Sequence, residues 1–334
     1  MTSPVRAEVV RGPQILDRLT PGRTGLDRAM TQAPTPFQTP GWYRAWIMRA
    51  ARSELATPIL LEAGVPGGGR VHVALQVHQT TAGPVLRPLS WPWADYHDAC
   101  DMTPGGHPDA PRVLAEAVDH LQGIERARLD LPDLLDGGLL HRAAVQLGAR
   151  LRSSSTVVSI DLGDAEHVRS IVTRKETARK ARRLARLGQL SLVHLRDPAD
   201  LAPRLPTFFA MHAAQWKDRA DVVAPFDGGV VDQTFAAVAA QPDAGVLLTE
   251  LQLDSSPLAM YFGFLHRGRY WGYRTAYDRR YWRLSPGHQL VVQMIIDFSR
   301  SPVHTFDLMR GGYAYKLEYA SSVSANVHAE RDLP

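Results

Sequence analysis

A group of side chains suited to acid–base chemistry lies near the end of the chain. Asp307 stands in an apolar segment that runs into a pair of glycines, and Tyr313, Tyr315 and Lys316 follow closely. In α/β sheets, sites usually form where strands end. A carboxylate there can orient or deprotonate an amine, a phenol can protonate a leaving group, and a lysine can stabilise developing negative charge. These four residues are the predicted catalytic group.

A second pattern, Leu284-Ser285-Pro286-Gly287, is typical of a helix start. Ser285 suits the N-cap, Pro286 suits the first helical position, and Gly287 leaves room for a phosphate. Unsatisfied N–H groups and the helix dipole attract anions at such a place. Ser-Pro-Gly also opens helices that bind nothing. The prediction of a phosphate-bearing donor, such as coenzyme A, therefore depends on the neighbouring strands. One strand precedes this helix, and the strand after it carries Asp307 into a Gly-Gly turn.

The third pattern is a basic segment at residues 174–187, which holds seven arginines and lysines against one acid and carries a charge of +6. Since the whole chain is +4, the remainder is −2. Arg179 and Arg183 lie on one side of the expected helix. A charged row is often only a solvated face, but like charges one turn apart cost ~0.2–0.5 kcal/mol per pair. We therefore expect an anionic partner: coenzyme phosphates, a tRNA acceptor arm or an acidic carrier protein.

Two further pairs are candidates for contacting the substrate. Asp95 and Tyr96 lie in a short segment bracketed by prolines, and His212 and Trp216 lie one turn apart on an expected helix. The spaced acids around Asp95 favour a loop beside a pocket over a metal site. With one cysteine and no paired-histidine motif, no metal site is expected.

Composition favours a globular protein with room for two domains, with 334 residues, 45% hydrophobic and 22% charged. No apolar run approaches the roughly 20 residues that span a bilayer. We expect a cytoplasmic protein with no membrane insertion and no DNA partner.

Hydrophobic periodicity and turn signals predict two passes of similar size that meet near residues 150–154. Each pass combines strands joined by tight turns with crossover helices, so the predicted class is α/β (α+β), with two mixed-sheet lobes and flanking helices. The longest expected elements of the second pass are helices over 164–187, 198–217 and 286–300, and strands over 244–253, 257–266, 269–277 and 302–309.

The residues Tyr277-Asp278, the Leu284–Gly287 elbow, Phe306-Asp307, Gly311 and Tyr315-Lys316 together resemble the GNAT-superfamily acetyltransferases of the CelD-like group, relatives of Fem-type peptidyltransferases. The resemblance extends over most of the chain and is most specific after residue 244. It implies a tandem GNAT-like fold, with residues 1–150 on the acceptor side and residues 151–334 binding the donor and carrying catalysis. It also implies that the loop of Arg283, Leu284, Ser285, Pro286, Gly287 and His288 cradles the donor pyrophosphate.

The resulting hypothesis is an N-acyltransferase that moves an acyl group from acyl-CoA directly onto a small-molecule amine, with no tightly bound cofactor. The acceptor is expected between the halves, near Asp95, Tyr96, His212 and Trp216. A single glycine in the elbow departs from the usual GNAT signature, so the donor stays open. Aminoacyl-tRNA or an acyl carrier protein is the alternative donor, and a non-catalytic binding module is the third reading.

Overall fold

The computed structural model divides the chain into two compact units. It describes residues 6–22, 26, 32–50, 56–121, 124, 126–217, 226 and 228–334. The first unit comprises Met1–Thr156 and Ala325–Pro334, and the second comprises Val157–Ser324. The chain thus leaves the first unit after Thr156 and returns to it at Ala325 for its last residues.

In the first unit the strands follow the order β1, β2, β3, β4, β6 and β13, and the short β5 pairs with β3. Neighbours are antiparallel except β4 and β6, which are parallel. Their bounds are Ala7–Arg11 (β1), Ala56–Gly64 (β2), Arg70–Thr80 (β3), Gly83–Pro88 (β4), Cys100–Asp101 (β5), Arg128–Leu134 (β6) and Ser322–Asp332 (β13).

In the second unit the strands follow the order β8, β9, β10, β11, β12 and β7. Again all neighbours are antiparallel except the fourth and fifth, β11 and β12. Their bounds are Arg150–Asp161 (β7), Leu190–Leu195 (β8), Val246–Leu253 (β9), Ser256–His266 (β10), Arg269–Tyr277 (β11) and Thr305–Arg310 (β12). The two units therefore share one arrangement of strand directions, and the predicted mixed α/β class is confirmed.

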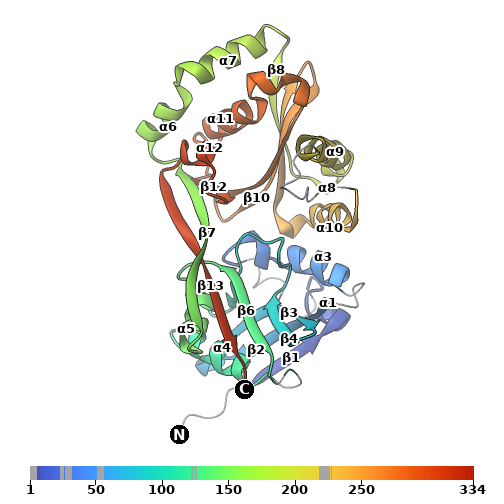
Figure 1. Cartoon of the computed structure of the whole chain (residues 1–334), viewed down its shortest axis with the longest axis vertical. Helices are drawn as coiled ribbons and strands as arrows, with labels where there is room; N and C mark the ends of the chain where they lie inside the picture. Colours follow the sequence, from blue (N-terminus) through green and yellow to red (C-terminus); the bar gives the residue numbers. More distant parts are fainter. Residues whose placement is uncertain are drawn as a thin grey trace. The chain divides into compact units, whose positions relative to one another are not determined.

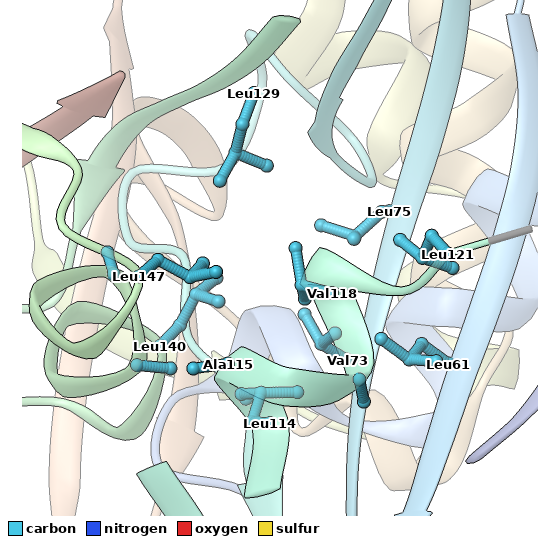
Figure 2. Packing of buried hydrophobic residues seen from close by; sticks show 14 of the residues in the cluster. Leu61, Val73, Leu75, Leu114, Ala115, Val118, Leu121, Leu129, Leu140 and Leu147 are labelled. Atoms are coloured by element: carbon cyan, nitrogen blue, oxygen red, sulfur yellow. The ribbon is translucent and has the colours of Figure 1, made fainter. Parts of the chain in front are cut away.

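The core of the first unit lies under two helices, α4 (Ala110–Asp119) and α5 (Leu139–Gln146). Figure 2 shows Leu114 and Val118 of α4 packing toward Val73 and Leu75 of β3. The opposite face of the sheet carries α1 (Ile15–Arg18) and α3 (Pro40–Ala50). Buried apolar side chains at alternate strand positions therefore hold α4 and α5 on one face.

In the second unit α6 (Ala165–Val172), α7 (Lys175–Ala185) and α11 (Pro286–Phe298) cover one face of the sheet, and α9 (Leu205–Trp216) and α10 (Val230–Ala239) cover the other (Figure 1). Strand β10 shows the alternation that separates them. Tyr261 belongs to the cluster packed by α11, whereas Phe262 stacks on Phe208 and meets Phe235 edge-on.

Two long helices expected from periodicity are interrupted. The helix expected over 164–187 breaks after α6, where the Thr173 hydroxyl bonds the Arg169 carbonyl at 2.8 Å and Arg174 turns to extended ψ, its guanidinium donating to the Glu318 carbonyl. The helix expected over 198–217 divides into α8 (Pro198–Leu201) and α9. Among the described residues, no helix is both long and apolar enough to cross a membrane.

Candidate active site

The two central strands of the second unit pair over only three residues of each. The parallel ladder joins Arg269–Trp271 to Thr305–Asp307 and goes no further. Beyond it Tyr273 is an extra residue on β11 opposite β10, and β12 gains one residue opposite β7 after Asp307. Bulges of this kind end pairing and redirect backbone groups. Backbone of β11 beyond Trp271 is thus outside the β12 ladder, where a ligand carbonyl can bond it.

Asp307 lies where this ladder ends and is only 2% exposed. Its Oδ1 accepts a 2.7 Å hydrogen bond from the Met309 N–H, and its Oδ2 lies 3.3 Å from Arg269 Nη1. Met309 has φ +64°, so the strand turns sharply beside the carboxylate. A buried charge needs such partners. The surroundings thus hold a carboxylate in a fixed position at the predicted catalytic place.

The Lys316 ammonium caps the end of β12. Its Nζ donates to the Leu308 carbonyl at 2.6 Å and to the Arg310 carbonyl at 2.5 Å, and it lies 3.5 Å from the Met309 carbonyl. The side chain is buried. A lysine carries three N–H donors. Lys316 therefore bonds the backbone that follows Asp307 and holds this end of β12 in position.

Tyr313 is the N-cap residue of α12 (Ala314–Leu317) and Tyr315 lies within this helix; their rings stack with 6.1 Å between centroids. Both side chains are more than half exposed. Desolvation of the hydroxyl and then the nearby Tyr313 raise the pKa of Tyr315. A phenol with a raised pKa stays protonated, which suits a proton donor.

The predicted elbow does form the start of α11, with Pro286 as its first residue. Ser285 occupies the N-cap position with φ +50°, but its hydroxyl does not cap the helix; it accepts a 2.8 Å bond from Lys180 Nζ. Ser285 and Pro286 thus occupy the expected positions, although no side-chain cap forms. The first intrahelical bond runs from the Gln289 N–H to the Ser285 carbonyl at 3.0 Å. The N–H groups of Gly287 and His288 precede it and point out of the helix end.

The basic helix α7 packs directly on this elbow. Besides the Lys180 bond, Thr177 Oγ1 lies 2.9 Å from His288 Nε2, and Gln289 Nε2 donates to the Thr177 carbonyl at 3.1 Å. His288 Nδ1 meets the Tyr319 hydroxyl, and burial lowers the pKa of His288. Two features that the sequence treated as separate anion contacts thus form one surface.

The remaining cations of α7 face solvent. Arg179 pairs with Glu176 at 2.8 Å, whereas Arg182, Arg183 and Arg186 are exposed and pair with no carboxylate in the part of the chain that the structure describes. Arg283 is exposed too, its guanidinium 5.4 Å from the Trp282 ring centroid, and Leu284 is buried. Positive charge is therefore available beside the start of α11.

The four predicted substrate residues are all partly or fully buried and are divided between the units. Asp95 and Tyr96 lie in the first unit, where Asn326 Nδ2 donates to the Asp95 carbonyl and Gln38 Nε2 to the Tyr96 carbonyl. His212 and Trp216 lie on α9, on the face of the second sheet opposite α11. A common acceptor site for all four remains a prediction.

His212 is 2% exposed and packs against Phe208, Phe226 and Trp216. Burial, and next the charge of Arg274, lower its pKa to about 3. Its Nδ1 has no hydrogen-bond partner among the described residues. His212 is therefore a neutral imidazole set in an aromatic cluster.

One cluster in the described residues has the spacing of metal ligands: Asp130, His328 and Glu330 in the first unit. Arg87 bonds Asp130 at 2.8 Å, and Arg150 bonds Glu330 at the same distance. Arginines already neutralise these carboxylates, so the arrangement is an ion-pair network. Sequence reasoning missed it because its members lie far apart along the chain.

Residues 172–317 match the acetyltransferase (GNAT) domain family. This segment contains the elbow, the basic helix and Asp307, and its match to the family supports an N-acyltransferase activity. The resemblance inferred from the sequence is thereby confirmed at this level. No curated protein matches the chain in sequence.

Solved structures share the fold across both units at low sequence identity. FemX has a TM-score of 0.61 at 9% identity, over 91% of this chain and 94% of its own. The C-terminal domain (DUF2156) of a protein described as a lysylphosphatidylglycerol synthetase from Agrobacterium fabrum has a TM-score of 0.57 at 11% identity, over 91% of this chain and 89% of its own. A protein of unknown function from Bacteroides thetaiotaomicron has a TM-score of 0.52 at 10% identity, over 88% of this chain and 90% of its own.

Proposed function

We propose that the second unit transfers an acyl group from acyl-CoA directly to the amine of a small molecule, with the donor phosphates at the start of α11. One observation carries the proposal: Lys180 of the basic helix bonds Ser285 at the N-cap of α11. Cationic side chains and unsatisfied helix N–H groups then act on the same anion. The donor-binding role of the second unit and the acceptor-side role of the first unit are part of this proposal.

The steric surroundings of Gly287 support a phosphate there. A Cβ built on Gly287 meets only Tyr277 Cδ1, at 3.6 Å, which is ordinary contact. The protein itself therefore does not require glycine at this position. A ligand that approaches the backbone closely does.

In the proposed reaction the amine attacks the thioester carbonyl, the C–N bond forms and the C–S bond breaks. Asp307 orients the amine and takes its proton, while backbone of β11 beyond Trp271 holds the carbonyl oxygen. Tyr315, with Tyr313 beside it, returns a proton to the leaving thiolate. Lys316 fixes the strand end that carries these groups and contributes positive charge nearby.

The alternative donors are aminoacyl-tRNA and an acyl carrier protein, and the exposed arginines of α7 favour them. Arg182, Arg183 and Arg186 extend the basic surface along α7. A long polyanion would use this row, whereas one CoA molecule needs only the cations nearest the elbow. The structural likeness to FemX shows a shared fold and does not choose between donors.

Intact-mass detection of acyl transfer to a panel of primary amines tests the proposal, with acetyl-CoA, longer acyl-CoA, aminoacyl-tRNA and acylated holo carrier protein each supplied as the donor. The comparison is between the wild type, the triple variant Arg182→Gln/Arg183→Gln/Arg186→Gln and the control Arg196→Gln/Arg300→Gln. We expect CoA-dependent product, with both variants near wild type. Product formed only from aminoacyl-tRNA or holo carrier protein, and lost in the triple variant alone, would replace CoA by the polyanionic donor. Absence of product from every donor contradicts both.

A further inference from the structure

A cavity of about 470 Å³ opens in the first unit, on the face of the sheet opposite α4 and α5. Its lining includes Arg18 at the end of α1, Glu62 on β2, and Arg70 and His72 on β3. Small-molecule sites commonly occupy about 300–1,000 Å³. The Arg70 side chain is 65% exposed, so the cavity reaches solvent at this residue. The space is large enough for a small metabolite.

Its floor holds polar atoms that no protein group satisfies. Glu62 and His72 are cross-strand partners, so their side chains share one face of the sheet. They are 6% and 1% exposed. Glu62 Oε2 and both ring nitrogens of His72 lack hydrogen-bond partners within the described structure. Buried polar atoms in folded proteins are nearly always bonded, so three together require an explanation.

The charges around the cavity indicate what would satisfy them. Arg70 Nη1 is 3.5 Å from Glu62 Oε2 but outside hydrogen-bonding geometry. Arg18 is already paired with Glu8. Burial raises the pKa of Glu62 and lowers that of His72 to about 4, so the imidazole is neutral and one nitrogen offers a lone pair. A desolvated carboxylate beside a neutral imidazole favours a cation that donates several hydrogen bonds.

A metal ion fits this floor poorly. The one group of three ligand atoms within 4.8 Å of each other in the described chain is the Asp130 cluster. A primary ammonium has three N–H donors and needs no such convergence. Water could bond the imidazole but would add no charge beside Glu62, whose 3.5 Å ion pair with Arg70 includes no hydrogen bond.

We propose that this cavity binds a small primary amine in its protonated form. The ammonium donates to Glu62 Oε2 and to a ring nitrogen of His72, and a polar or anionic end of the ligand meets Arg70 at the opening. The site lies wholly within the first unit. Because binding alone defines it, the inference does not depend on the acyl transfer proposed for the second unit.

Isothermal titration calorimetry of the full chain tests this, using ethanolamine, glycine, 4-aminobutyrate and putrescine, with ethylene glycol and acetate as probes that lack the amine. We expect saturable binding of at least one amine and none of the two controls. Glu62→Gln and His72→Phe should each weaken that binding at least about tenfold. Glu116→Gln, at a half-buried acid on α4 that pairs with Arg112, should leave it unchanged.

Thermal unfolding of the same variants separates binding from a structural role. If Glu62 serves a ligand, Glu62→Gln removes a buried charge that Arg70 pairs with only at 3.5 Å and without a hydrogen bond, and the Tm should stay equal or rise. If neither variant folds, ¹⁵N NMR of wild-type His72 replaces them, and its ring signals should shift on saturation with the amine. Failure of every amine to bind, binding that ignores both substitutions, or unshifted ring signals would overturn the proposal.

Discussion

Lys180 Nζ bonds Ser285 Oγ at 2.8 Å, across 105 positions of sequence. This contact joins the basic helix α7 to the N-cap of α11, with Thr177 and His288 beside it. A basic helix or a helix N-terminus alone is an ordinary feature of a protein of this size. Held together, they place helix N–H groups and cationic side chains around one point. The proposed donor site rests on this junction.

Substitution of Gly287 should separate donor binding from folding. Gly287→Ala adds a methyl group that meets only Tyr277 at 3.6 Å, and alanine is favoured over glycine in helices by about 1 kcal/mol. We expect an unchanged or higher Tm together with a KM for the donor raised about tenfold or more. Steady-state kinetics and thermal unfolding measure the two effects. An unaffected KM in both Gly287→Ala and the bulkier Gly287→Val would remove the phosphate from this helix end.

Substitution of Asp307 should lower activity with little change in stability, whereas substitution of Lys316 should lower stability. Asp307→Asn keeps an oxygen that accepts from the Met309 N–H, so the Tm should change little, while loss of the base should lower kcat by about 10²–10⁴-fold. Lys316→Met leaves the carbonyls of Leu308 and Arg310 without their donor and should lower the Tm. Asp297→Asn, an exposed acid on α11, is the control. Full activity in Asp307→Asn would exclude Asp307 as the base.

Local pattern predicted much of the second unit because its elements obey local rules. Leu290, Met294 and Phe298 recur at helical spacing, and all are buried in α11 as expected. Strand β4 was missed because glycine and two prolines hide it in the sequence. The break between α6 and α7 depends on contacts of Arg174 with Glu318, which no local periodicity contains.

The site was predicted by residue type, and its geometry was not. Asp307 was expected at the end of a strand, and it lies where the ladder of β11 and β12 ends. Two bulges lie where that ladder ends, and their positions depend on register across four strands, β10, β11, β12 and β7. The cavity beside Glu62 was not predicted either, because Glu62 and His72 become neighbours only through the pairing of β2 with β3.

Asp98 should make the first unit less stable as pH rises. Burial raises its pKa to about 7, although the N–H groups of Leu140 and Ala99 donate to it. Because the folded-state pKa exceeds the unfolded value, the contribution is fully present below about pH 4 and is lost as pH rises through about 7. The full shift corresponds to about 4 kcal/mol. Urea unfolding across this range should show the decline.

Asp98→Asn keeps an oxygen toward Leu140 and cannot ionise, so it should flatten that decline. Asp109→Asn, at a half-buried acid before α4, should keep it. A wild-type stability that rises from pH 4 to pH 7 in parallel with Asp98→Asn would show that this carboxyl titrates normally.

His212 should have the opposite pH dependence. Its pKa of about 3 lies below the unfolded value, so its contribution is present above about pH 6.5 and is lost as pH falls toward 3. At pH 5 the loss is about 2 kcal/mol. His212→Phe fits a cluster that already holds Phe208 and Phe226 and cannot protonate, so its stability advantage over the wild type should grow as pH falls. His304→Phe, at an exposed histidine, should show no such trend.

The same His212→Phe variant tests whether His212 contacts the substrate, by its kcat/KM for the amine at pH 7.5. A stable variant with lowered kcat/KM supports the predicted substrate contact. A stable variant with wild-type kcat/KM shows that His212 serves packing alone.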